Sequence, residues 1–263
     1  MKLLLSIPCF VAGLCLAADE RPLPPRNLRI EEVKQRVRGA LVFENPQGVP
    51  GDYKLVYQQN FEHSGALVNF VFSDPKVWRV AETSTNSSLE LFGKSDYQPK
   101  HRSPFNIALI KDKLFGDFVM DVDLQSTVKP YGHQDMCLFF GFESTNRFYY
   151  VHLAVAPDPH AHNTFIVNDA PRLAIAKQTS RGVTWGENQW HRARLERKTP
   201  DGTIKVYFDD FETPIMVAED KTFGKGYIGF GSFDDMGRID NIRIYAPSME
   251  TKPVRFFQPA NIR

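Results

Sequence analysis

Short runs of alternating apolar and polar residues fill the sequence from residue 53 to residue 246, and Gly, Pro, Asn and Asp separate them. A period of two residues is typical of β-strands, and the helical period of 3.6 residues does not occur in this region. This many short strands can bury their apolar faces when two sheets stack on each other. We therefore predict an all-β domain, a two-sheet antiparallel β-sandwich, over residues 53–246. The expected strands are residues 54–61, 78–81, 88–92, 105–109, 117–125, 135–143, 147–154, 164–167, 172–177, 189–197, 203–208, 227–233 and 238–245.

The segment Thr199-Pro200-Asp201-Gly202 lies between two of these strand patterns. Proline and glycine supply the backbone angles that a tight turn requires, which predicts a β-hairpin joining residues 189–197 to residues 203–208. No internal repeat of roughly 20–50 residues occurs, which disfavours propellers and solenoids.

The N-terminus predicts export. An apolar run extends from Leu3 to Leu16 and is followed by Ala17 and Ala18, as in a secretory signal peptide. The run is shorter than the ~20 apolar residues that cross a bilayer, so we expect a signal peptide over residues 1–17, cleavage near Ala18, and a secreted or periplasmic protein without a membrane span. Residues 18–52, rich in Pro, Arg and Glu, are expected to be a linker or docking segment, and residues 247–263 a C-terminal tail.

Composition limits how the domain is stabilised and what it binds. Cys9 and Cys15 lie in the expected signal peptide, so Cys137 has no partner for an intramolecular disulfide. Cys137 lies in an apolar strand pattern, where a small buried side chain is expected. The 21 Phe and 9 Tyr can supply a large core. The formal charge of +1 gives no basic excess for phosphate backbones, so nucleic acid is not an expected partner.

Several motifs resemble one superfamily. WHRARLER from Trp190 and TIKVYFDD from Thr203 resemble neighbouring strands of laminin-G-like and concanavalin A-like domains, and GYIGFGSF from Gly226 with GRIDNIRI from Gly237 resemble their closing pair. The NFE run from Asn60 and the WRV run at residues 78–80 are similar to the opening of the bacterial 3-keto-disaccharide hydrolase family. The resemblance covers residues 54–246 and implies a concanavalin A-like jelly roll that handles carbohydrate.

One motif of that superfamily is absent. Glucanases of the laminarinase and lichenase type carry a Glu-x-Asp-x-x-Glu strand, which places three carboxylates on one sheet face. The nearest match here is Met120-Asp121-Val122-Asp123-Leu124, which puts Asp121 and Asp123 on one side of a strand without a glutamate partner. A solvated outer strand face is the favoured interpretation of these two aspartates.

Histidine, aspartate and asparagine gather between residues 147 and 172. On the expected strand 147–154, alternation places Phe148, Tyr150 and His152 on one aromatic and polar face. Sugars bind such mixed surfaces, because their C–H faces pack on aromatic rings while their hydroxyls form hydrogen bonds. The expected catalytic residues are His152, His162 and Asp158, and the expected substrate-binding residues are Tyr150, His133, Asp135, Arg147, Asn163, Asn168, Arg172 and Trp185. Trp185 is included because its Gly-flanked loop would expose the indole to a sugar.

The loop Pro157-Asp158-Pro159-His160-Ala161-His162 also suggests a metal. In an extended loop, His160 and His162 point the same way and, with Asp158, suit a zinc-type transition metal. Two alternatives remain open: hydrogen bonds within a loop stiffened by prolines, and general acid or base work by the histidines.

A structural calcium site is a further expectation. Glucanases of this fold often hold calcium with the aspartate that corresponds to Asp240, and Asn60 and Glu62 near the opening strand would complete the site. Ca²⁺ takes six to eight oxygen ligands, and these side chains supply only some of them. A turn or capping hydrogen bond by Asp240 is the alternative.

Three functions follow from these features. The favoured one is a secreted glycoside hydrolase acting on oligosaccharides, similar to the 3-keto-disaccharide hydrolases, because the polar cluster contains acids and histidines. The second is a noncatalytic lectin-like module that binds oligosaccharide or polysaccharide, and the third is a laminin-G-type interaction domain.

Overall fold

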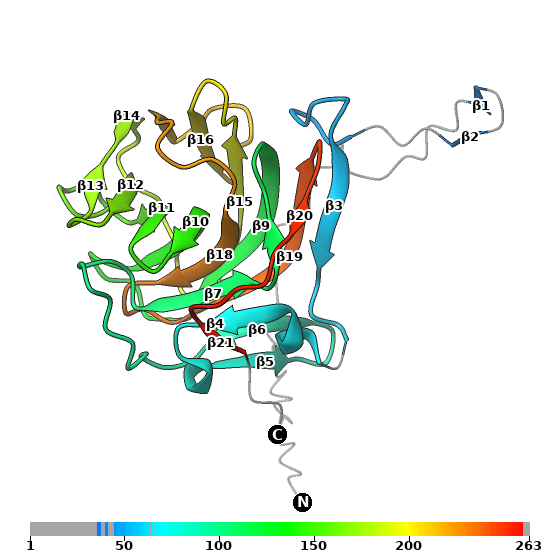
Figure 1. Cartoon of the computed structure of the whole chain (residues 1–263). Helices are drawn as coiled ribbons and strands as arrows, with labels where there is room; N and C mark the ends of the chain where they lie inside the picture. The colour runs from blue at the N-terminus through cyan, green and yellow to red at the C-terminus, as the bar shows by residue number, and fades with distance from the viewer. Residues whose placement is uncertain (1–35, 38–39, 42–44, 64, 260–263) are drawn as a thin grey trace, which may run out of the picture.

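A computed structural model describes residues 36–37, 40–41, 45–63 and 65–259, and its strands form two large antiparallel sheets (Figure 1). The first sheet has the order β13 (Leu173–Ala174), β12 (Asn163–Asn168), β11 (Arg147–Ala154), β10 (Asp135–Ser144), β18 (Tyr227–Ser232), β7 (Asn106–Ile110), β4 (Phe70–Phe72) and β21 (Gln258–Pro259). The second has the order β14 (Ala176–Thr179), β17 (Met216–Glu219), β16 (Thr203–Phe208), β15 (Trp190–Arg197), β9 (Phe118–Ser126), β19 (Gly237–Ala246), β6 (Ser87–Leu91) and β5 (Trp78–Glu82).

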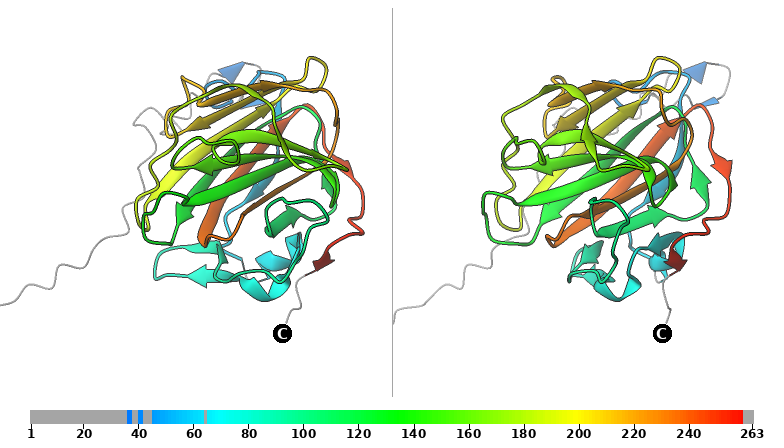
Figure 2. Two further views of the ribbon diagram at one scale, coloured as in Figure 1. Left: turned by 90° about the vertical axis from the view of Figure 1, so that its left-hand side faces the viewer. Right: turned by 60° about the vertical axis from the view of Figure 1, so that its left-hand side comes forward.

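Smaller elements complete the described part of the chain. Strand β3 (Lys54–Gln59) also pairs with β19, and two short pairs join β1 (Arg36–Val37) to β2 (Ala40–Leu41) and β8 (Lys113–Leu114) to β20 (Glu250–Thr251). Two 3₁₀ turns, η2 (Ala66–Asn69) and η3 (Pro75–Val77), are the helical elements within the described residues. The two-sheet antiparallel β-sandwich predicted from the alternation is therefore confirmed, and the stacked sheets are visible from two sides in Figure 2.

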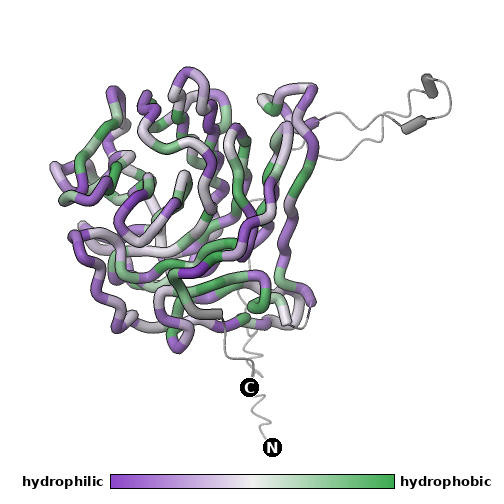
Figure 3. Tube along the Cα trace, in the orientation of Figure 1, coloured by the Kyte–Doolittle hydropathy of each residue, from purple (hydrophilic) through white to green (hydrophobic). Residues whose placement is uncertain are grey.

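The main core lies between the two sheets. On β9 the side chains of Met120, Val122 and Leu124 are buried there, and on β11 those of Tyr149 and Val151 face them from the other sheet. Strand alternation produces this arrangement, since every second residue faces the opposing sheet. Hydrophobic segments accordingly follow the strands in Figure 3, whereas many connecting loops are hydrophilic.

A second apolar cluster covers the outer face of the first sheet. It contains Phe139, Phe148 and Tyr150, and the C-terminal residues Phe256 and Phe257 pack against it. The predicted division of β11 into two faces is confirmed, but the aromatic face is buried: Tyr150 is 0% exposed. The C-terminal segment also adds β21 to the edge of this sheet beside β4.

A β-bulge interrupts the alternation on β10. Its register shifts between Phe140 and Ser144, and Gly141 has a φ of 53° in the left-handed region that favours glycine. A Cβ at this position would lie 2.9 Å from the Tyr149 ring. Strict alternation would place Phe139 and Phe142 on opposite faces of the sheet. Because of the bulge, both side chains lie in the outer cluster.

Most predicted strands are confirmed, including 147–154 and the hairpin between β15 and β16, where Gly202 has a φ of 82°. The predicted strand 172–177 is wrong: β13 and β14 lie in different sheets, because the chain crosses from one sheet to the other near Ile175. Strand β4 was missed because all of Phe70, Val71 and Phe72 are buried, so the segment does not alternate.

Residues 45–53 dock on the outer face of the second sheet, while residues 1–35, with the expected signal peptide, lie outside the described part. Val49 and Tyr53 pack against that sheet, and Arg194 Nη1 donates to the Gln47 carbonyl oxygen at 2.6 Å. Arg194 also donates two hydrogen bonds to Asp121, at 2.6 and 2.8 Å. The expected solvated face is therefore wrong for Asp121, which is 5% exposed beneath this segment.

Candidate functional site

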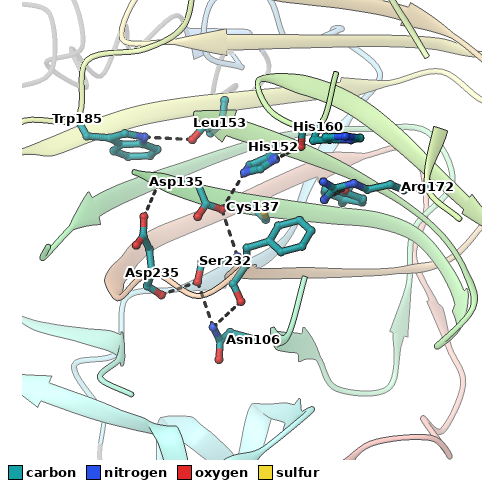
Figure 4. Close-up of polar contacts among 12 residues, drawn as sticks. Asn106, Asp135, Cys137, His152, Leu153, His160, Arg172, Trp185, Ser232 and Asp235 are labelled. Carbon is teal, nitrogen blue, oxygen red and sulfur yellow. Dashed lines mark hydrogen bonds and ion pairs between the residues drawn. The ribbon is translucent and has the colours of Figure 1, made fainter. Parts of the chain in front are cut away.

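Polar side chains converge where β10 begins, on the outer face of the first sheet (Figure 4). The register places Asp135 opposite Ala154 and Cys137 opposite His152, and β18 flanks β10 on its other side. The residues of the β18–β19 turn therefore reach Asp135 although they lie about a hundred positions later in the chain. We refer to Tyr131, Asp135, His152, Asp234 and Asp235 as the end cluster.

Asp135 is the centre of the end cluster. Its Oδ2 atom lies 3.1 Å from His152 Nε2, accepts a 3.2 Å hydrogen bond from the Phe233 backbone N–H and a 3.4 Å bond from the Cys137 thiol. Asp135 is 1% exposed, so these donors replace the water that would otherwise solvate the carboxylate. A buried carboxylate with so many donors is held in a fixed position.

The ring of His152 is oriented by two acceptors. Its Nδ1 atom lies 3.2 Å from the His160 carbonyl oxygen, to which it must donate, and its Nε2 atom faces the Asp135 carboxylate. Both ring nitrogens of His152 therefore face oxygen atoms that can accept a hydrogen bond. The ring of His152 also stacks on that of Phe233, with centroids 5.4 Å apart.

Asp235 forms the second buried carboxyl of the end cluster. Its Oδ1 accepts a 2.6 Å hydrogen bond from the Tyr131 hydroxyl, and its Oδ2 accepts a 2.7 Å bond from the Asp135 backbone N–H. Burial is the largest influence on this group and raises its pKa to about 6, against the opposing effect of the two hydrogen bonds. Asp234 beside it is exposed, and its carboxylate lies within 4.8 Å of ligand atoms of Asp135 and Asp235.

Arg172 lies over the aromatic side of this site. Its Nη1 donates a 3.1 Å hydrogen bond to the Tyr150 hydroxyl, and its guanidinium carbon lies 4.5 Å from the Phe233 ring centre. Burial raises the pKa of Tyr150 above its ordinary value, so the phenol stays neutral. The prediction that Tyr150 presents a sugar-stacking surface is wrong, because Arg172 and neighbouring rings cover it.

Other predicted residues lie around the end cluster. His133 is exposed, with its ring 6.4 Å from that of Tyr131, and the His160 ring is exposed while its carbonyl holds His152. Asp158 is exposed and accepts a hydrogen bond from the His160 backbone N–H. Asn163 lies opposite His152, and its side chain accepts from the Ala176 N–H, which joins β12 to the chain entering β14.

Two predicted binding residues lie at the other end of β11. Arg147 Nη1 donates a 2.6 Å hydrogen bond to Asn168 Oδ1, and the two residues are opposite each other in the β11–β12 register. Arg147 Nη1 also lies 3.5 Å from Asp169 Oδ2. They form a separate polar patch, because the strand length separates Arg147 from His152.

His162 does not join the end cluster. It is 0% exposed, its Nε2 lies 2.9 Å from the Ser180 hydroxyl, and burial lowers its pKa to about 4. The loop turns back at the Asp158–Ala161 bridge and His162 has a φ of 46°, so the expectation that His160 and His162 point the same way is wrong. In the described part of the chain, neither group of three potential metal ligands contains His160 or His162.

Trp185 is also placed differently from the prediction. Its side chain is 1% exposed, and its Nε1–H donates a 3.1 Å hydrogen bond to the Leu153 carbonyl oxygen. The indole packs edge-on against Phe208 at 5.1 Å. An indole buried in this way is part of the core, so the exposed sugar-stacking role is wrong.

Asp240, Glu62 and Asn60 flank the turn before β6. Asp240 accepts hydrogen bonds from Asn86 Nδ2 at 3.1 Å and from the Asn241 N–H at 2.7 Å, while Glu62 accepts from the Ser87 N–H at 2.9 Å. Asn60 Oδ1 is 3.4 Å from the Glu62 N–H. These contacts match the hydrogen-bonding alternative, and calcium at this position stays a prediction.

Sequence reasoning missed Tyr131, Asp234 and Asp235. The signal available was a pair of aspartates in the short turn between two predicted strands, 227–233 and 238–245. Their role depends on the pairing of β10 with β18, which brings residues distant in the chain together. Alternation within one strand contains no information on that pairing.

Comparisons with known proteins bear on the fold alone. No family model matches the sequence, and no curated protein is similar to it. A GH43 protein from Bacillus licheniformis has a TM-score of 0.51 at 12% identity, covering 72% of this chain and 39% of that one. The carbohydrate-binding module CBM66 from Bacillus subtilis scores 0.47 at 16% identity, covering 70% and 96%, and a Lotus tetragonolobus seed lectin scores 0.44 at 13% identity, covering 75% and 99%.

These likenesses are at low identity and therefore show the fold alone, a two-sheet antiparallel β-sandwich. The finer resemblance to 3-keto-disaccharide hydrolases stays a prediction. No helix among the described residues combines the length and apolar character that crossing a membrane demands.

Proposed function

We propose that this protein binds carbohydrate through the end cluster and the exposed side chains beside it. The observation that carries the proposal is the hydrogen bond from Tyr131, which is 45% exposed, to the Asp235 carboxyl, with the Asp234 carboxyl beside it, where β10 begins. An aromatic ring offers a surface for sugar C–H groups, while carboxylates and His133 offer hydrogen-bond partners for hydroxyls. The fixed positions of Asp135 and His152 beneath them support a preformed site.

Calorimetric titration of the full chain with plant and algal oligosaccharides tests this proposal. Tyr131→Ala and Asp234→Asn are expected to weaken binding at least about tenfold each, which corresponds to one lost contact or charge-assisted hydrogen bond. Arg147→Gln, in the polar patch at the other end of β11, is the matched control and is expected to leave affinity unchanged. Absence of binding to every sugar, or sensitivity to Arg147→Gln alone, would overturn the proposal.

Hydrolysis of an oligosaccharide is the second candidate. Glycosidases use two carboxyl groups on either side of the bond that breaks, about 5 Å apart in retaining enzymes. Ligand atoms of Asp135, Asp234 and Asp235 all lie within 4.8 Å of one another, which supports an acid pair at this site. In this candidate the exposed Asp234 and the buried Asp235 take the catalytic roles for which the sequence suggested His152, His162 and Asp158. His152 instead holds Asp135 in position.

Turnover separates the two candidates. Oligosaccharides with and without oxidation at the sugar 3-position, as the resemblance to 3-keto-disaccharide hydrolases suggests, are incubated with the full chain and with Asp235→Asn. Product release that Asp235→Asn abolishes supports hydrolysis. Binding without product release supports the lectin-like function. The absence of both binding and product release would favour an interaction domain.

We also propose that the protein is exported, with cleavage near Ala18. This rests on the apolar run that precedes Ala17. N-terminal sequencing of protein expressed with its own leader tests it, and a chain that retains Met1 in the cytoplasm would contradict it.

A further inference from the structure

The side chains of Asp135, Cys137 and His152 form a buried group whose donor atoms all lie within 4.8 Å of one another. Asp135 and Cys137 are on β10 with one residue between them, so they share a face, and His152 is directly opposite Cys137 on β11. Carboxylate, thiolate and imidazole are the three ligand types that zinc takes in proteins. The backbone pairing of two rigid strands therefore presents one ligand of each type.

The distances suit a tetrahedral ion. Zinc bonds of about 2.0–2.3 Å at tetrahedral angles place neighbouring ligand atoms about 3.2–3.8 Å apart. In the protein, Asp135 Oδ2 lies 3.1 Å from His152 Nε2 and 3.4 Å from Cys137 Sγ. An ion between these atoms requires little movement of the side chains.

The surroundings of His152 match those of a metal-binding histidine. Such histidines donate their second ring N–H to a carboxylate or backbone carbonyl, which fixes the tautomer and leaves the other nitrogen free to bind. His152 Nδ1 makes this contact with the His160 carbonyl oxygen at 3.2 Å, and Nε2 points at Asp135. The His160 atom in this contact is the backbone carbonyl oxygen. The exposed His160 ring, which the sequence had suggested as a metal ligand, is not part of it.

We propose that Asp135, Cys137 and His152 bind Zn²⁺, with its fourth position left for a water molecule or a ligand group. Binding forms Zn–O, Zn–S and Zn–N bonds and releases the thiol proton of Cys137 to solvent. No electron is transferred. The bound group, which consists of carboxylate, thiolate, imidazole and Zn²⁺, carries no net charge.

This charge balance matters because the group is buried, with Cys137 0% and His152 7% exposed. Leaving uncompensated charge in such a site is costly, whereas the charges of one carboxylate and one thiolate balance the charge of Zn²⁺. Arg172 is near enough to act on Cys137 electrostatically. The inference does not rest on the proposed carbohydrate function.

Cobalt substitution tests the site directly. Co²⁺ is titrated into the full chain, and Zn²⁺ is then added in competition. A thiolate-to-cobalt charge-transfer band with tetrahedral d–d bands is expected, at one equivalent of metal that Zn²⁺ displaces. Calorimetry of Zn²⁺ binding in buffers with different ionisation enthalpies is expected to report proton release, because a thiol must lose its proton to bind the ion.

Variants connect the signal to the residues. Cys137→Ser is expected to abolish the charge-transfer band, which excludes Cys9 and Cys15 as its source, and Asp135→Asn to weaken Zn²⁺ binding at least about 100-fold. His63→Ala, at an exposed histidine outside the end cluster, is the control and should leave the charge-transfer band unchanged. Wild-type protein without the charge-transfer band, or a band that survives Cys137→Ser, would overturn the proposal whatever the variants do to folding.

Discussion

The Tyr131 hydroxyl donates a 2.6 Å hydrogen bond to the buried Asp235 carboxylate, and so connects an exposed aromatic ring to the buried part of the end cluster. This bond stabilises the charged form of Asp235, whose pKa burial has raised to about 6. Tyr131→Phe removes it, so the pKa of Asp235 is expected to rise by about 0.5–1 unit, the value of one hydrogen bond. Carboxyl NMR titration in chelator measures the shift, with Tyr97→Phe as control, and an unchanged or lower pKa would contradict it.

Asp235 also predicts a specific dependence of stability on pH. Its pKa is higher in the folded protein, about 6, than its ordinary value of 3.8, so the folded state binds more protons between these values. The stability it contributes is complete below about pH 4 and is lost as pH rises through 6. Relative to Asp235→Asn, the free energy of unfolding of the wild type should therefore fall by about 2 kcal/mol from pH 4 to pH 7, allowing for partial solvent screening.

Urea unfolding in chelator at several pH values measures this difference. Glu219→Gln is the matched control, because its carboxylate is exposed and its pKa is lowered by Lys177 instead of raised by burial. A wild-type curve that gains stability over Asp235→Asn between pH 4 and pH 7 would show that the sign is wrong.

The sandwich could be predicted from sequence because strand identity depends on neighbours along the chain. The alternation of Phe148, Tyr150 and His152 with Tyr149 and Val151 determines the two faces of β11, and the structure confirms them. What covers each face is set by distant segments. Phe233, more than eighty residues after Tyr150, packs together with Arg172 on the face that the sequence had suggested for sugar.

The candidate site was predicted in part for the same reason. Asp135, His152 and Arg172 were identified as polar residues near one another in the chain or on adjacent strands. Asp235 belongs to the site through the β10–β18 ladder, and His162 leaves it because the loop turns back at Asp158. Strand order and loop conformation depend on the packed protein, so the local pattern does not contain them.

Trp185→Phe is expected to reduce the free energy of unfolding by about 2–3 kcal/mol without changing sugar affinity. The substitution removes the hydrogen bond to the Leu153 carbonyl and leaves a cavity beside Phe208. Urea denaturation and sugar titration measure the two effects, with Thr184→Ala, its exposed neighbour, as control. If Trp185→Phe kept normal stability but lost sugar binding, the sugar-stacking role that the sequence suggested for Trp185 would be supported.

The predicted calcium site gives a chelator-sensitive melting temperature. If Ca²⁺ binds Asp240, Asn60 and Glu62, millimolar Ca²⁺ should raise the midpoint by several degrees over chelator, because a ligand that binds only the folded state stabilises it. Glu62→Gln should reduce the shift, and it keeps an oxygen for the Ser87 N–H. A wild-type midpoint that does not respond to Ca²⁺ or chelator would leave Asp240 as an acceptor for Asn86 and Asn241.

The Asp121–Arg194 pair predicts a large stability loss that an exposed pair does not share. Both side chains are buried: that of Asp121 is 7% exposed and that of Arg194 is 2% exposed. Arg194→Met leaves the buried Asp121 carboxylate without its ion-pair partner, so it is expected to lower the free energy of unfolding by about 3–5 kcal/mol. Because the penalty comes from the unpaired charge, adding Asp121→Asn should recover part of it. Lys177→Met, in a pair whose side chains are 64% and 55% exposed, should cost less than about 1 kcal/mol. Urea unfolding of the four proteins measures these differences, and equal costs for Arg194→Met and Lys177→Met would mean that water reaches Asp121.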